Sequence, residues 1–132
     1  MTGAADDLLV RTADALRVFT QVDTADDGSL RFDYAGALCS LNAMTLTDGL
    51  DVVSLTCVLA WDRPASAALH KRVAARNDEL QFGTVVAFTR GRTVDVVLRY
   101  AFPASGLDDT ALTTMLLLVL SGAETAREGL VP

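Results

Sequence analysis

Two cysteines have the clearest capacity for chemistry in this chain. Cys39 and Cys57 are its only cysteines, and the strand pairing predicted below places them directly opposite each other. We expect two small buried thiols, reduced in the cytosol, because a bridge between paired strands is strained. A cross-strand disulfide that acts as a redox switch is the alternative that the sequence leaves open. Two cysteines without a nearby histidine do not form a zinc site.

The remaining candidates for catalysis or metal binding fit ordinary surface roles. His70, the only histidine, lies beside Lys71 and Arg72 in a predicted helix, away from its apolar side. Residues 23–28 resemble a calcium loop, but its third position is alanine and its twelfth, where a bidentate Glu belongs, is Tyr34. We therefore predict no catalytic residue, no metal site and no cofactor. An enzyme would need a polar cleft with perturbed carboxylates or His70.

The elements that would position these side chains follow from apolar spacing and turn residues. Helices are predicted over 4–20, from the N-cap Asp62 to about Leu80, and from the N-cap Asp108 to about Glu128. Strands are predicted over 29–34, between the turns at 35–36 and 47–49, over 50–61, over 82–88 and over 92–102. Residues 1–132 thus form a single domain of the α+β class. Its order is α-β-β-β-α-β-β-α, with helices packed on an antiparallel sheet.

The turns also predict which strand positions face the core. A two-residue turn at Ala35-Gly36 pairs Phe32 with Cys39, and a three-residue turn at 47–49 keeps odd positions inward on both flanking strands, Trp61 included. A three-residue turn at 89–91 would place even residues of the last two strands inward. The inward residues predicted there are Phe82, Val86, Phe88, Val94, Val96, Leu98 and Tyr100.

Composition limits the partners and the location. The formal net charge is −6, and an acidic surface repels phosphate backbones, so nucleic acid is not an expected partner. The longest apolar run, residues 115–120, is too short to cross a bilayer. The first residues lack the basic region of a signal peptide. We expect a cytoplasmic protein without membrane contact.

Two surfaces remain as candidate partner or dimer interfaces. The helix over 108–128 has an apolar stripe for the sheet, but further leucines lie outside it, so they are either covered within the monomer or form an interface. The outer face of the sheet carries apolar residues among polar ones, which would mark a binding site if they touch. The interface candidates are Leu117, Leu118 and Leu120 on the helix, and Met44, Val52, Val58, Val85 and Val97 on the sheet.

Three stretches carry a resemblance to a known family. They are the strand-to-helix junction 58–64, the helix exit 77–85 with Asn77 followed by Phe82-Gly83, and the strand-loop-helix ending over 100–108. With the element order, these stretches resemble the YbjN family, which is similar in fold to the chaperones of type III secretion. The resemblance implies a cytoplasmic, non-enzymatic role as a sensory-transduction regulator or chaperone-like protein.

These observations lead to two functional hypotheses. The first is a chaperone-like or adaptor protein, acting as a homodimer, that binds another protein whose identity the sequence does not give. The alternative is a small-molecule-binding sensory domain with a pocket between the sheet and the C-terminal helix.

Overall fold

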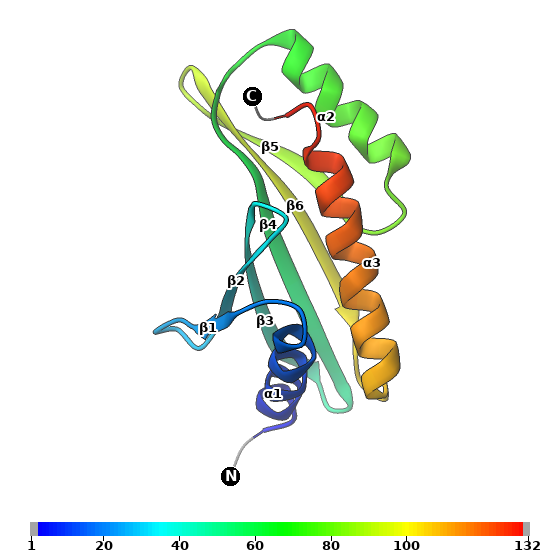
Figure 1. The fold of residues 1–132 in the computed structure, drawn as a ribbon. Coiled ribbons are helices and arrows are strands. Elements are labelled where there is room, and N and C mark those ends of the chain that lie inside the picture. Colours follow the sequence, from blue (N-terminus) through cyan, green and yellow to red (C-terminus); the bar gives the residue numbers. More distant parts are fainter. Residues whose placement is uncertain (1–2, 131–132) are drawn as a thin grey trace.

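The computed structural model describes residues 3–130, which form three helices and six strands (Figure 1). The strands join in one sheet in the order β1-β2-β3-β4-β6-β5, with every neighbouring pair antiparallel. The predicted α+β class is confirmed. The elements are α1 (Ala4–Arg17), β1 (Val22–Thr24), β2 (Leu30–Tyr34), β3 (Ala37–Thr47), β4 (Leu50–Pro64), α2 (Ala67–Glu79), β5 (Thr84–Arg90), β6 (Thr93–Pro103) and α3 (Asp109–Arg127).

One strand lies in a segment that we predicted as a loop. β1 pairs with β2 at the edge of the sheet, where Val22 faces Phe32 and is buried. Three residues with two polar side chains are too short to show the alternation that identifies a strand. The observed order is therefore α-β-β-β-β-α-β-β-α.

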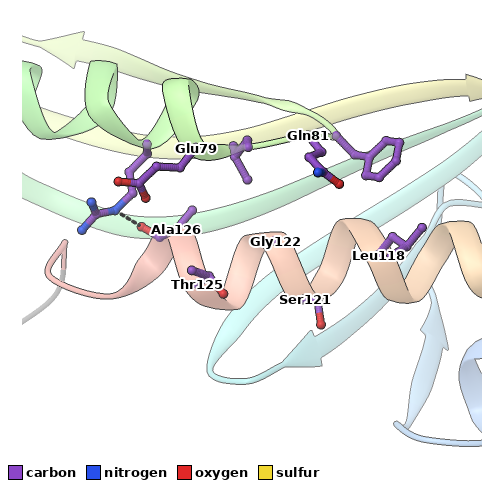
Figure 2. Close-up of a pocket in the computed structure, with 10 residues that line it drawn as sticks. Glu79, Gln81, Leu118, Ser121, Gly122, Thr125 and Ala126 are labelled. Atoms are coloured by element: carbon purple, nitrogen blue, oxygen red, sulfur yellow. Dashed lines mark hydrogen bonds between the residues drawn. The ribbon is translucent and has the colours of Figure 1, made fainter.

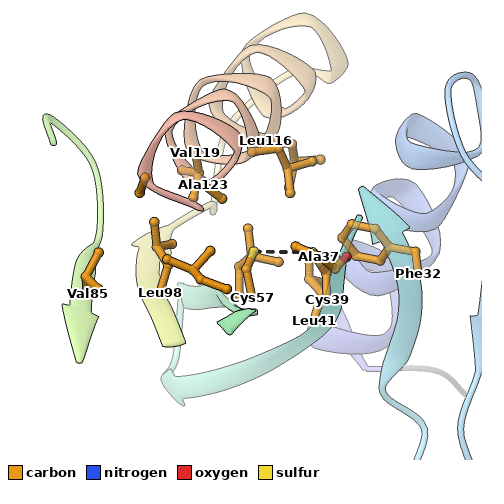
Figure 3. Packing of buried hydrophobic residues seen from close by; sticks show 14 of the residues in the cluster. Phe32, Ala37, Cys39, Leu41, Cys57, Val85, Leu98, Leu116, Val119 and Ala123 are labelled. Carbon is orange, nitrogen blue, oxygen red and sulfur yellow. Dashed lines mark hydrogen bonds between the residues drawn. The ribbon is translucent and has the colours of Figure 1, made fainter. Parts of the chain in front are cut away.

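The inner face of the sheet is covered by the helices. Leu116, Val119 and Ala123 of α3 lie directly over Leu98 and Cys57 (Figure 3). The core cluster also takes in Leu8 and Leu16 of α1 and Leu69 and Val73 of α2. These side chains pack between α3 and the sheet, and the cleft described below lies instead between α2 and α3.

The pairing around β3 follows the prediction. Phe32 pairs with Cys39, and Cys39 pairs with Cys57. The β3–β4 turn differs in detail, because it contains only Asp48 and Gly49, and a register shift between Thr45 and Thr47 supplies the extra residue. A two-residue turn plus a bulge gives the same even register as the predicted three-residue turn.

The register predicted for β5 and β6 is wrong by one residue. Arg90 pairs with Thr93, so the turn holds only Gly91 and Arg92. A one-residue slip moves every side chain of a strand to the opposite face. Val85 is consequently in the core at 3% exposure, and Phe88, predicted inward, is 43% exposed.

The junction between β4 and α2 also differs from the prediction. β4 continues to Pro64, and the N-cap of α2 is Ser66, whose Oγ accepts the backbone N–H of Leu69 at 3.1 Å. Asp62, the predicted cap, instead has a backbone φ of 48° inside the irregular end of β4. The register of β4 against β6 shifts between Val58 and Ala60 and again before Arg63.

The exit of α2 explains the Asn and Phe-Gly stretch in structural terms. The Asn77 amide donates to the Val85 carbonyl at 2.9 Å and accepts the Val85 N–H at 2.8 Å. Asn77 thereby occupies part of the free edge of β5 as a neighbouring strand would. Gly83 has a φ of +97°, and a Cβ there would lie 3.1 Å from Leu98 Cδ2. Both residues therefore serve the fold.

Candidate binding surfaces

The outer face of the sheet carries two apolar rows that cross neighbouring strands. The upper row, near the β5–β6 turn in Figure 1, consists of Leu38, Val58, Val97 and Val86, which are paired in that order. The lower row, near the β3–β4 turn, consists of Met44, Val52 and Pro103, also paired in that order. These residues are absent from the core cluster under the helices. Four of the five predicted outer-face residues, Met44, Val52, Val58 and Val97, thus lie in two separate rows.

Two polar rows separate the apolar ones. The first crosses Ser40, Thr56, Arg99 and Thr84, and the second crosses Asn42, Ser54 and Ala101. Strand side chains repeat on one face every two residues, so the four rows lie on the same side of the sheet. The outer face is therefore amphipathic along the strands.

Two aromatic side chains extend the upper row, and the sequence did not identify either of them as a surface residue. Phe88 lies two positions from Val86 on β5, and Arg99 Cζ lies 5.5 Å from the centroid of its ring. Trp61 follows the buried Ala60 and is 56% exposed. Asp95, which pairs with Phe88, accepts the backbone N–H of Asp62, so Trp61 and Phe88 belong to the same end of the face, and exposed aromatic residues are typical of a protein-binding surface.

Asp95 holds the irregular end of β4 that turns Trp61 outward. Its carboxylate accepts the backbone N–H of Asp62 at 2.9 Å and forms an ion pair with Arg90. Asp95 is only 9% exposed, so these contacts satisfy a nearly buried charge. Asp95 thus positions Trp61 by fixing the residue that follows it.

The structure divides the predicted interface residues into surface and core. Met44 and Val58 are accessible on the outer face, and Val52 and Val97, at 9% and 8% exposure, are nearly buried there. Leu117 and Leu118 are 39% and 44% exposed on α3. Leu120 and Val85 belong to the core, so they cannot form the predicted surface.

A cleft lies between α2 and α3, beside the exposed leucines of α3 (Figure 2). Its volume is about 260 Å³, and it is open to solvent. Gly122 allows close contact, since a Cβ there would lie 3.2 Å from Leu80 Cδ2. The apolar lining consists of Leu80, Phe82, Leu118, Gly122 and Ala126.

The rim of this cleft offers acceptors rather than free cations. Arg76 donates to the carbonyls of Ala126, at 3.1 Å, and Glu128, so its guanidinium is already engaged. Glu79 forms no ion pair within the described part of the chain. The cleft therefore suits an apolar group flanked by positive charge or hydrogen-bond donors.

The charges are segregated along the length of the sheet. Residues 4–17, 48–51 and 105–109, which lie toward the β3–β4 turn, contain seven acidic and two basic side chains. Residues 62–95 and 121–128, at the opposite end, contain six acidic and seven basic ones. One end is thus strongly acidic and the other is nearly neutral with a small positive excess.

The two cysteines are free thiols in the core. Cys39 Sγ lies 3.3 Å from Cys57 Sγ and 3.6 Å from the carbonyl oxygen of Ala37. The hydrogen bond between the thiols and their burial raise the pKa of Cys57. Since the thiolate is the reactive form, the raised pKa protects Cys57, and burial shields both side chains from reagents in the folded protein.

Other candidate chemistry finds no further support in the described residues. Among residues 3–130, no group of three or more His, Cys, Asp and Glu side chains could hold a metal ion. In the acidic loop, the Ser29 hydroxyl and N–H donate to Asp27 and lower the pKa of its carboxyl, as in a local turn. None of the helices in this range is long and apolar enough to cross a membrane.

The fold and these surfaces define an α+β domain whose antiparallel sheet is covered by helices on one face and carries apolar rows on the other. The chain belongs to the YbjN family, described as "putative bacterial sensory transduction regulator", whose model matches residues 5–131. This result confirms the resemblance predicted from the sequence.

A solved structure shows the same fold. The chain is similar to the crystal structure of "YbjN, a putative transcription regulator from E. coli", with a TM-score of 0.65 and 12% sequence identity. The match covers 92% of this chain and 86% of that one. No curated protein matches the chain in sequence.

Proposed function

We propose that this chain is a non-enzymatic regulatory protein of the cytoplasm that binds another protein, in a chaperone-like or adaptor role, as a homodimer. The observation that carries the proposal is the apolar cleft between α2 and α3 with the exposed Leu117 and Leu118 beside it. The description of its family as a regulator supports the same role.

The chemistry of the cleft indicates what kind of partner segment fits. Its floor would accept one apolar side chain, and Glu79 on the rim would attract a neighbouring lysine or arginine. The net charge of −6 also favours a basic partner segment, because it attracts positive charge to the protein as a whole. Desolvated apolar anchors with a polar rim are the usual arrangement of binding hot spots.

Capture of the tagged chain from its own cells, with crosslinking and mass spectrometry, tests this proposal. We expect a stoichiometric partner whose recovery falls at least about tenfold in Leu118→Glu, as for loss of an interface side chain. Val10→Glu is the matched control, because Val10 is 61% exposed on α1. Equal recovery with Leu118→Glu and with the unchanged chain would contradict the proposal.

A small-molecule sensor is the second candidate, and the same cleft favours it. A volume of about 260 Å³ is just below the roughly 300–1,000 Å³ of ordinary ligand pockets. A metabolite that raises the melting temperature of the unchanged chain, but not of Leu118→Glu, would support this function. A partner protein with no responsive metabolite would support the adaptor.

A further inference from the structure

We propose that the outer face of the sheet binds a second copy of this chain, face to face and with the strands running in opposite directions. This inference rests on the proposed homodimer and specifies its surface and geometry. It concerns a different surface from the cleft between α2 and α3, so each can be tested without the other.

The first argument is the area of the face. The rows from Leu38 to Met44 span seven residues of β3; four strands cross the two upper rows, and three cross the two lower rows, which β5 does not reach. With one further row at each end, the face is roughly 34 Å long and about 14 to 19 Å wide, or about 570 Å² of flat footprint, and its projecting side chains give it a larger accessible area. Stable dimers bury upwards of about 600 Å² per copy. The face is therefore large enough for a two-fold interface.

The second argument is the order of the rows. Consider a two-fold axis that lies in the interface plane and runs perpendicular to the strands. It places β4 of one copy over β4 of the other and brings the upper end of one face to the lower end of the other. The upper apolar row then meets the partner's lower apolar row, and Val58 faces Val52 of the partner subunit. The two polar rows also meet, with Thr56 opposite Ser54 of the partner subunit. The face is thus complementary to its own reversed copy.

The third argument is charge. The antiparallel arrangement brings the acidic end of one copy to the end of the other copy that has a small positive excess. A two-fold axis along the strands would instead place the two acidic ends together, and like charges in close contact disfavour association. Both two-fold axes pack the sheets face to face, and the separation of charge favours the axis across the strands, which makes the strands of the two copies antiparallel.

The aromatic extension fits the same arrangement. Trp61, beyond the upper row, would reach the β3–β4 turn of the second copy, where Leu46 is 61% exposed. Sheets that pack face to face with strands aligned within about 30° bring such side chains into contact. Trp61 is the only tryptophan, so its fluorescence reports directly on this contact.

The first experiment measures mass in solution by sedimentation across protein concentration. We expect dimers whose affinity weakens as ionic strength rises, and a Trp61 emission that shifts to shorter wavelength on association. Trp61→Ser should weaken association by about 30-fold or more, the effect of a hot-spot residue. Val10→Glu, on the exposed side of α1, should leave the dimer unchanged. A chain that stays monomeric at all concentrations would overturn the inference.

A second experiment tests the direction of the strands. Leu38→Cys and Met44→Cys copies are mixed and treated with a short bismaleimide, with each variant alone as the control. The antiparallel dimer predicts crosslinking in the mixture and little in either variant alone. Equal crosslinking of Leu38→Cys alone would overturn the arrangement. If the chain proves monomeric while Leu118→Glu still loses its partner protein, the homodimer is wrong and the binding of a partner protein at the cleft stands without it.

Discussion

The two faces of the sheet share four long strands, yet their apolar residues are arranged differently. On the inner face, apolar residues continue along each strand, as Val53, Leu55, Cys57 and Leu59 do on β4, and all four are at most 1% exposed. On the outer face, apolar rows occur only at the two ends, with polar rows between them. The helices cover the first face and leave the second accessible (Figure 1).

This difference separates two roles within the same strands. Continuous apolar burial gives the inner face most of the free energy of folding. The outer face is polar enough to remain soluble and has apolar groups only where a partner could cover them. Substitutions at neighbouring residues of one strand should therefore affect folding stability when the side chain points inward and partner binding when it points outward.

The largest expected difference between the faces is in thiol reactivity. In the native monomer, at protein concentrations too low for association, Cys39 and Cys57 should react with a thiol reagent at least about 1,000-fold more slowly than a cysteine introduced by Thr56→Cys, because they require global opening. The raised pKa of Cys57 adds to this protection. Reaction rates measured with and without denaturant check it. Comparable rates for the inner and outer cysteines would contradict the division of the faces.

The inner face around β3 could be predicted from the sequence. The two-residue turn at Ala35-Gly36 permits one register, and alternating apolar residues on β3 and β4 select the same face, so Cys39 was placed opposite Cys57 correctly. Local turn chemistry and burial agree there, which makes the prediction secure. The capping of α3 by Asp108, whose side chain accepts the Ala111 N–H, is local and was also predicted.

The outward positions of Met44, Val52, Val58 and Val97 were predicted correctly, but those of the β5 residues and Trp61 were not, because they depend on contacts between distant segments. Gly91 fits a two-residue or a three-residue turn equally well, and apolar residues occur at both parities of β5, so Val85 and Phe88 were assigned to the wrong faces. The outward position of Trp61 depends on Asp95, which is 33 residues beyond Asp62 in the sequence. A bulge held by a distant side chain leaves no local pattern.

The next largest expected difference between the two faces is in folding stability, and two valines of β4 test it. Val53→Ala on the inner face should lower the free energy of unfolding by about 2 kcal/mol, from lost burial and the cavity that remains. Val58→Ala on the outer face removes the same atoms from a half-buried site and should cost well under ~1 kcal/mol in the monomer. Denaturant unfolding at low protein concentration measures both. Equal losses would show that the outer face also belongs to the folding core.

The smallest expected effect is the loss of stability on substitution of Asp95, the nearly buried carboxylate that fixes the irregular end of β4. Asp95→Asn keeps an oxygen for the Asp62 N–H but removes the ion pair with Arg90, whose side chain is 63% exposed. Because one partner is solvated, the stability lost should be about 1 kcal/mol or less. A looser β4 end should also change the emission of Trp61, which no core substitution of similar cost would do.

Asp33→Asn is the matched control for that variant, since Asp33 is exposed on the outer side of β2 and its carboxylate has no ion pair among the described residues. Its stability and its Trp61 emission should equal those of the unchanged chain. If Asp95→Asn behaves in the same way, the bulge does not depend on this charge. The outward position of Trp61 would then follow from the backbone of Asp62 alone, whose φ of 48° a glycine at that position would accept without strain.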